Sequence, residues 1–174
     1  MVIPLLTRID HVGIACRDLD HTVELYRATF GLEVVSTEVN EEQGVREAML
    51  RVGSGAVVAG VAAQAAAGLA DAVAGGVPVA SPAVLSGTSY VQLLEPLGPD
   101  TPVGKFLARR GEGIHHVGYG VTDVKQALSQ IGGTGIRLLD ERPRHGSMGA
   151  SIAFLHPADL GGVLTELVQF APDS

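Results

Sequence analysis

Apolar residues recur at three- and four-residue intervals in the segment that ends near residue 30. Val23 and Tyr26 fall on one face of this segment, which predicts an amphipathic helix. Asp18 or Asp20 is suited to cap its beginning, because an aspartate side chain can accept a hydrogen bond from a free backbone N–H. Gly31 follows the last apolar position and predicts the end of the helix.

A second segment shows the same spacing about one hundred residues later. Asp123 precedes it as a candidate N-cap, and Ala127, Leu128 and Ile131 share a face. Gly132 and the glycine after it predict its end. A third helical pattern, over residues 101–110, would connect the two halves of the chain.

Short runs of β-branched and alternating residues follow each of the two main helices and predict strands. The expected strands are Glu33–Val39, Val45–Val52 and Tyr90–Glu95 in the first half, and Ile136–Leu139, Ser151–Leu155 and Val163–Phe170 in the second. With the strand that precedes each helix, both halves have the order β-α-β-β-β.

The two halves are related by an internal repeat at an offset of 105. His11–Gly13 falls on His116–Gly118, and Asp18 falls on Asp123. A single β-α-β-β-β module exposes one face of its sheet, and two modules can bury both faces by closing together. We therefore expect one α+β domain, 1–174, of two paired modules at about 7–98 and 112–171.

The first module is longer than the second. In it 81 residues separate His11 from Gln92, whereas 50 separate His116 from Glu166, so about 31 residues are extra. The excess coincides with an Ala/Gly-rich tract at about 53–87. A helix and a low-complexity loop are equally compatible with it. A membrane span is not expected, since alanine and glycine gain little from hydrocarbon.

Composition and charge narrow the function classes. The chain has 174 residues and a formal net charge of −7, so it offers no basic surface for nucleic acid. Its single cysteine, Cys16, excludes an internal disulfide and a cysteine metal cluster, and we expect it to be a small core residue. No export signal is evident. A reducing compartment, by default the cytoplasm, is expected.

Polar residues within predicted strands suggest a metal site. His11 and His116 are each followed by small residues on the same strand face, which predicts open space beside the imidazoles. Gln92 and Glu166 lie mid-strand among apolar neighbours and would need a strong partner if they faced inward. Together they give an N₂O₂ set that leaves coordination positions free for a substrate. The alternative is that all four are satisfied core or solvated strand residues.

Several phrases resemble the methylmalonyl-CoA epimerase family of the vicinal oxygen chelate superfamily, from about Thr7 to Gln169 apart from the Ala/Gly-rich tract. They are IDHVGIAC, NEEQGVREAML, YVQLLEP, GEGIHHVGYGV, FLHP and GVLTELVQ. The resemblance implies a curved mixed sheet around a metal site and a homodimer. It implies four metal ligands and a proton-transferring base at Glu47. The implied ligands are His11, Gln92, His116 and Glu166.

The activity that the resemblance implies is epimerisation of (2R)- and (2S)-methylmalonyl-CoA through an enolate. A divalent ion (Co, Mn, Ni, Mg or Zn) would stabilise the developing oxyanion. Inversion needs a proton removed from one face and another delivered to the opposite face. Glu47 would be the first base, and Glu166 is the candidate for the second face, although metal ligation would lower its basicity. Whether ethylmalonyl-CoA is also a substrate stays open.

An acyl-CoA substrate would need local cations, because a chain at −7 repels a polyanion at long range. Lys105, Arg109 and Arg110 form one candidate cluster on the connector. A second comprises Arg142, Arg144 and the backbone of residues 145–149, which includes Ser147. His115 is expected to orient its strand, and His21, His145 and His156 are expected at the surface or in turns.

Three other functions share this predicted fold. A non-haem metal dioxygenase also uses two histidines and a carboxylate, although Gln92 as a fourth ligand would leave fewer sites for substrate and oxygen. A glyoxalase-type isomerase would share the enolate chemistry. A ligand-sequestering module would have lost its metal site.

Overall fold

The computed structural model describes residues 6–53 and 88–171, and their sheet mirrors the internal repeat. Almost all of the Ala/Gly-rich tract, and so the question of its conformation, lies outside them. In the described part the strand order is β2-β3-β4-β1-β5-β8-β7-β6. The first half comprises β1 (Leu6–Ala15), α1 (Leu19–Phe30), β2 (Glu33–Asn40), β3 (Val45–Val52) and β4 (Ser89–Pro96). The second half comprises β5 (Gly113–Val121), α4 (Val124–Gly132), β6 (Arg144–His145), β7 (Ser151–Leu155) and β8 (Thr165–Gln169), and α3 (Pro102–Arg110) joins the halves.

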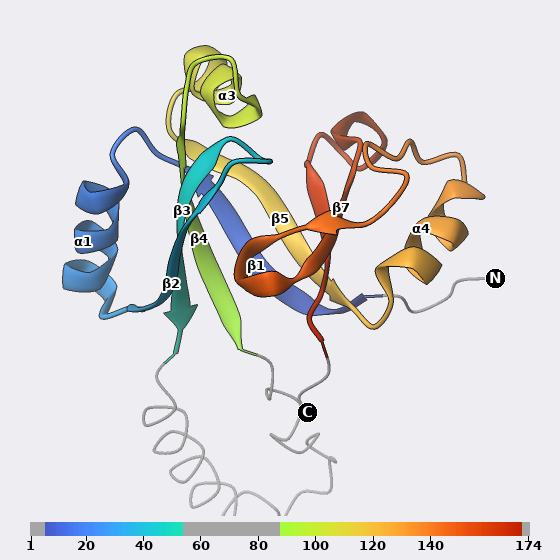
Figure 1. Ribbon diagram of the computed structural model, residues 1–174, viewed down its shortest axis with the longest axis horizontal. Coiled ribbons are helices and arrows are strands. Elements are labelled where there is room, and N and C mark those ends of the chain that lie inside the picture. Colours follow the sequence, from blue (N-terminus) through green and yellow to red (C-terminus); the bar gives the residue numbers. More distant parts are fainter. Residues whose placement is uncertain (1–5, 54–87, 172–174) are drawn as a thin grey trace, which may run out of the picture.

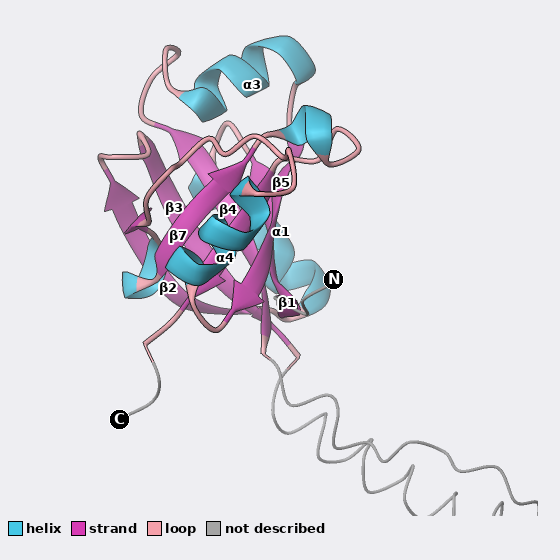
Figure 2. Cartoon of the chain, turned by 90° about the vertical axis from the view of Figure 1, so that its right-hand side faces the viewer, coloured by secondary structure: helices cyan, strands magenta, loops and turns pink. Residues whose placement is uncertain are grey.

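The two halves meet at the centre of the sheet, where β1 and β5 pair antiparallel. Each central strand also pairs in parallel with the last strand of its own half, β1 with β4 and β5 with β8. The resulting mixed sheet curls strongly (Figures 1 and 2), with α1 and α4 outside its two halves and α3 across one end. This arrangement confirms the expected α+β fold of two paired modules.

The helix boundaries follow from their caps. The Asp18 side chain accepts a hydrogen bond from the backbone N–H of His21, and the Asp123 side chain accepts one from Gln126. Gly31 ends α1 in the left-handed conformation, with φ of 67°. The connector is also helical, as expected. None of the helices in the described residues is long and apolar enough to cross a membrane.

The helices α1 and α4 each bury an apolar face against their own half of the sheet. Under α1, Leu19 packs with Cys16 and with β-strand residues that include Leu50 and Leu93. Under α4, an equivalent cluster forms around its buried face. Cys16 is thus the small core residue that we expected.

The expected strand Ile136–Leu139 is wrong. Leu138 makes an isolated bridge to Leu155, and the regular pairing with β7 belongs instead to the two-residue strand β6. Between these points the Asp140 carboxylate accepts the backbone N–H of Phe154. Because a side chain takes this bond and Pro143 has no N–H to give, a continuous ladder cannot form here.

Candidate metal centre and active site

Each candidate histidine lies opposite a glycine of the other module. His11 on β1 pairs with Gly118 on β5, and His116 on β5 pairs with Gly13 on β1. A Cβ atom on either glycine would overlap the imidazole ring that faces it. Each glycine thus accommodates the histidine of the opposite module; of the two rings, His116 also lines an open cavity, as predicted, whereas His11 is not among the residues that line it.

The two candidate oxygen ligands lie on the strands that flank β1 and β5, each paired with one of these glycines. Gln92 on β4 pairs with Gly13, and Glu166 on β8 pairs with Gly118. Residues paired across neighbouring strands point to the same face of a sheet. The register therefore brings all four candidate ligand side chains to one face, two from each module.

Three of these side chains converge closely. The Nε2 atoms of His11 and His116 lie 3.0 Å apart, and Glu166 Oε2 lies 2.8 Å from the first and 3.4 Å from the second. All three residues are buried, and their donor atoms lie within 4.8 Å of one another. One ion could be held by all three.

Gln92 lies beside these three residues, and only the nitrogen of its side-chain amide has hydrogen-bond partners. Its Nε2 donates to Glu47 Oε2 at 2.7 Å and to Ser147 Oγ at 2.8 Å. Its Oε1 is buried and has no hydrogen-bond partner. A buried amide oxygen without a partner is costly, and a metal ion is a partner that would satisfy it.

Glu47 is fully buried on β3, beside Gln92. Ser147 Oγ donates to Glu47 Oε1 at 2.6 Å. Burial raises the pKa of Glu47 to about 7, and the charge of Glu38 acts in the same direction, while the hydrogen bond from Ser147 opposes it. A carboxyl group with this pKa can take up and release a proton near neutral pH.

Glu166 differs from Glu47 although both are buried. Burial opposes its ionisation, but hydrogen bonds from His11 and His116 lower its pKa to about 2. Glu166 is therefore held as a carboxylate, which suits a metal ligand better than a base.

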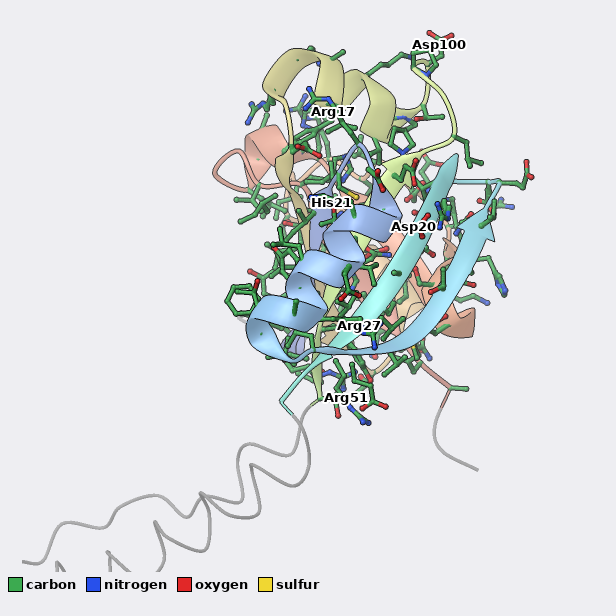
Figure 3. All side chains as sticks on the ribbon, turned by 90° about the vertical axis from the view of Figure 1, so that its left-hand side faces the viewer. Arg17, Asp20, His21, Arg27, Arg51 and Asp100 are labelled. Atoms are coloured by element: carbon green, nitrogen blue, oxygen red, sulfur yellow. The ribbon has the colours of Figure 1, made fainter. Side chains whose placement is uncertain are left out.

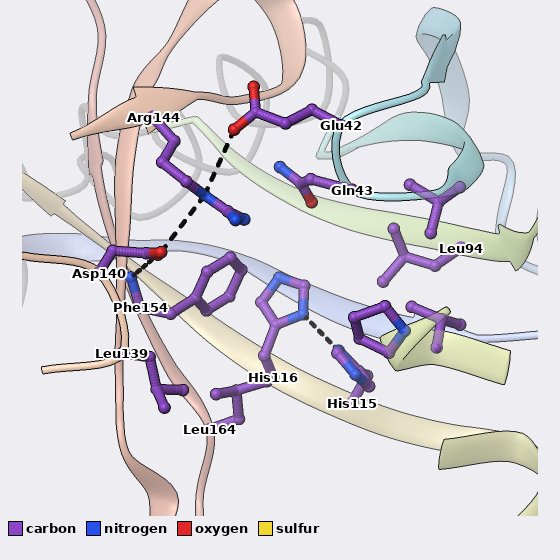
Figure 4. A pocket seen from close by; sticks show the side chains of 13 residues that line it. Glu42, Gln43, Leu94, His115, His116, Leu139, Asp140, Arg144, Phe154 and Leu164 are labelled. Carbon is purple, nitrogen blue, oxygen red and sulfur yellow. Dashed lines mark hydrogen bonds and ion pairs between the residues drawn. The ribbon is translucent and has the colours of Figure 1, made fainter. Parts of the chain in front are cut away.

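A cavity of about 310 Å³ opens beside His116. Leu94, Val103 and Phe154 give it apolar walls (Figure 4). Arg144 also lines it, with its Nε 3.4 Å from Asp140 and 3.7 Å from Glu42. The cavity thus combines an apolar surface with a cation that an anionic substrate could approach.

The other predicted cations are not brought to this cavity. Lys105, Arg109 and Arg110 are exposed on α3, whose first residues line the cavity wall. Arg142 lines a separate surface hollow. His21 lies on the outer face around α1 (Figure 3), as expected for a surface residue.

Sequence reasoning missed Asp10, which precedes the first candidate ligand. Its side chain is completely buried, and Oδ1 lies 3.1 Å from His11 Nδ1. The Nε of Arg8 donates to Asp10 Oδ2 at 3.1 Å. The sequence pattern that could have indicated Asp10 is its spacing from Arg8: residues two positions apart on a strand have side chains on the same face.

Comparison with known proteins places residues 8–167 in the Glyoxalase/Bleomycin resistance protein/Dioxygenase superfamily. The structure of a methylmalonyl-CoA epimerase in complex with methylmalonyl-CoA and NH4+ is 50% identical, with a TM-score of 0.76 over 95% of this chain and 96% of that chain. A variant of the Streptomyces coelicolor methylmalonyl-CoA epimerase, in complex with 2-nitronate-propionyl-CoA, is 49% identical with the same coverage and TM-score. The ethylmalonyl-CoA/methylmalonyl-CoA epimerase of Cereibacter sphaeroides is 28% identical over 95% of this chain and 99% of its own length.

Proposed function

The chain belongs to the Glyoxalase/Bleomycin resistance protein/Dioxygenase superfamily, and from this premise we propose that it is a methylmalonyl-CoA epimerase. It interconverts the (2R) and (2S) forms of its substrate by proton transfer at C2. The observation that carries the proposal is the buried carboxyl group of Glu47. It is hydrogen-bonded to Gln92, beside three side chains that could together bind one metal ion. The 50% identity to an epimerase that binds methylmalonyl-CoA supports the choice of substrate.

The candidate ligands suit a divalent metal ion. Two imidazole nitrogens and a carboxylate oxygen converge, and the unpartnered Gln92 Oε1 offers a fourth donor on the same face. In a six-coordinate ion this set leaves two positions free, and Co, Mn, Ni, Mg and Zn accept such donors to different degrees. We propose that His11, Gln92, His116 and Glu166 hold the ion. When bound it supplies Lewis-acid stabilisation of the enolate oxygen.

Glu47 removes the C2 proton in this proposal. A carbon acid next to a thioester needs a base that is ionised yet still basic, and a pKa of about 7 meets both needs near neutral pH. Gln92 and Ser147 each hydrogen-bond one of its carboxylate oxygens. They hold the base in one orientation toward the substrate.

Inversion requires a proton on the opposite face of the enolate. We propose Glu166 for this role, since it is the second buried carboxylate beside the candidate ion. Its pKa of about 2 makes it a much weaker base than Glu47. The two faces of the substrate would then exchange protons at unequal rates.

Arg144 is the proposed contact for the substrate carboxylate, because it lines the cavity beside His116. Guanidinium groups bind carboxylates through paired hydrogen bonds. Lys105, Arg109 and Arg110 are the proposed contacts for the coenzyme A phosphates, at the exposed side of the helix whose beginning lines the cavity. We further propose a homodimer in the cytoplasm.

The test is solvent exchange at C2. Purified protein is incubated with (2R)-methylmalonyl-CoA in deuterated water, with and without a chelator. Metal-dependent entry of deuterium at C2 with loss of optical purity is the expected result. Absence of exchange in metal-loaded protein would overturn the proposal, and oxygen consumption with a catechol would favour a dioxygenase. Isomerisation of a hemithioacetal without C2 exchange would favour a glyoxalase-type enzyme.

A further inference from the structure

Each central strand contains one extra residue immediately before its candidate histidine ligand. On β1, Ile9 and His11 pair with neighbouring residues of β5, and Asp10 between them has no partner. On β5, His115 is likewise skipped between Ile114 and His116. Asp10 and His115 are 105 positions apart, which is the offset of the repeat. The two bulges are thus equivalent.

A bulge redirects a side chain that regular alternation would send to the other face. Asp10 and His11 are consecutive and both buried, although neighbours on a regular strand point in opposite directions. His115 and His116 both line the cavity (Figure 4). Each bulge therefore places the preceding residue beside the imidazole of the candidate ligand.

The contacts across the two bulges match. Asp10 Oδ1 lies 3.1 Å from His11 Nδ1, and His115 Nδ1 lies 3.1 Å from His116 Nδ1. In both histidines the other ring nitrogen, Nε2, points toward the group of candidate metal-donor atoms. An imidazole that donates through Nδ1 keeps the lone pair on Nε2 free for a metal ion.

The two acceptors differ in charge. Asp10 is a buried carboxylate supported by Arg8. His115 can accept a hydrogen bond at Nδ1 only as a neutral imidazole, and it packs edge-on against Phe106 with ring centroids 5.0 Å apart. A carboxylate acceptor increases the basicity of a ligating histidine more than a neutral one does.

We propose that Asp10 and His115 are equivalent positioning residues that fix both histidine ligands with Nδ1 protonated and Nε2 toward the ion, Asp10 making His11 the stronger donor. The inference rests on the metal site of the proposed function. It adds two residues that hold ligands without touching the ion.

Long-range ¹H–¹⁵N NMR of the zinc-loaded full chain tests the geometry without any substitution. The expected spectrum shows Nδ1 protonated and Nε2 bound to zinc in both His11 and His116. Zinc on Nδ1 of either ring would overturn this inference and leave the proposed function standing. Failure of the intact protein to bind zinc, cobalt or manganese would overturn the metal site and this inference together.

Zinc dissociation constants, measured by competition with a chelating dye, test the contribution of each residue. Asp10→Leu and His115→Phe, which each remove the acceptor, should weaken binding by about 10- to 100-fold, with the larger loss in the first. His115→Gln, which keeps an acceptor, should recover most of the affinity. Asp100→Asn, a surface change (Figure 3), is the matched control.

Unfolding curves of the metal-free variants separate loss of the fold from loss of the contact. Folded Asp10→Leu and His115→Phe proteins with unchanged zinc affinity would contradict the proposal. If either variant does not fold, the tautomers of the intact protein decide the question.

Discussion

The two modules are most alike where they supply candidate ligands and least alike where they supply the candidate base. Each contributes one histidine from its central strand and one oxygen donor from its last strand. Met49 and Phe154 pair with these oxygen donors at equivalent positions of β3 and β7. Two residues earlier, the first module has Glu47 and the second has Ile152.

Ile152 is buried in an apolar cluster with Ala150 and Val168. Its counterpart Glu47 can be buried because Ser147, from the second module, and Gln92 satisfy its oxygens. Duplication thus explains a symmetric metal site, while the stronger proposed base, Glu47, has no counterpart in the second module. The asymmetry matches a reaction in which the two faces of the substrate carbon are treated differently.

The largest expected effect comes from removing the group that only the first module has. Glu47→Gln keeps the size of the side chain but not its basicity, and its amide nitrogen cannot accept one of the two hydrogen bonds that the carboxylate receives from Gln92 and Ser147. Deuterium exchange at C2 should fall by about 10²- to 10⁴-fold, with zinc affinity unchanged. Glu33→Gln, at an exposed glutamate of β2, is the matched control and should retain activity. Full exchange activity in the Glu47 variant would remove it from the mechanism.

The candidate metal site shared by the two modules can be disturbed by substituting a glycine that contacts a histidine ligand. In Gly118→Ala the new methyl group would overlap the His11 ring, so the ring must move. A displacement of about 1 Å can cost on the order of 10²-fold in rate. Gly98→Ala, where a Cβ meets open space, is the control. Equal zinc affinity and equal exchange rates in both variants would show that the opposed glycine and histidine are not coupled.

The cavity cation belongs to the second module and should affect binding more than chemistry. Arg144→Gln removes a charge-assisted hydrogen bond worth about 1.5–3 kcal/mol, so KM should rise by about 10- to 100-fold with a smaller change in kcat. Arg137→Gln, at an exposed ion pair with Asp159, is the control. Steady-state kinetics with methylmalonyl-CoA give both constants, and an unchanged KM would exclude Arg144 from the substrate site.

The smallest predicted effect is a pH dependence set by Glu47. The base must be ionised, and its pKa is raised to about 7 by burial. Below this pKa the active fraction falls about tenfold per pH unit, and above it kcat/KM reaches a plateau. A bound cation favours the carboxylate, so the midpoint in the metal-loaded enzyme should lie at or below pH 7. A profile that increases as the pH falls would contradict this role.

The parts of the fold and of the candidate site that depend on residues close together in the sequence, or on the internal repeat, could be predicted. The helix caps at Asp18 and Asp123 follow from side chains close to the backbone groups that they bind. The offset of 105 identified the two histidine positions that the structure brings together. Gln92 and Glu166 were candidates because each is a polar residue in the middle of a strand with apolar neighbours.

The parts of the structure that depend on contacts between residues far apart in the sequence could not be predicted from the local sequence pattern. Glu47 on its own reads as an exposed strand residue, and its burial depends on Ser147, 100 positions away. The bulge at Asp10 depends on the register with β5. The interruption at Asp140 likewise depends on a bond to β7.

The central claim is that one ion is shared by both modules. A crystal structure of the cobalt-loaded protein, with data collected at the cobalt absorption edge, tests it directly. The account predicts a single anomalous peak about 2.0–2.2 Å from the Nε2 atoms of His11 and His116, with oxygens of Gln92 and Glu166 completing the protein ligands. A peak bound within one module alone, or at Glu47 instead, would contradict it.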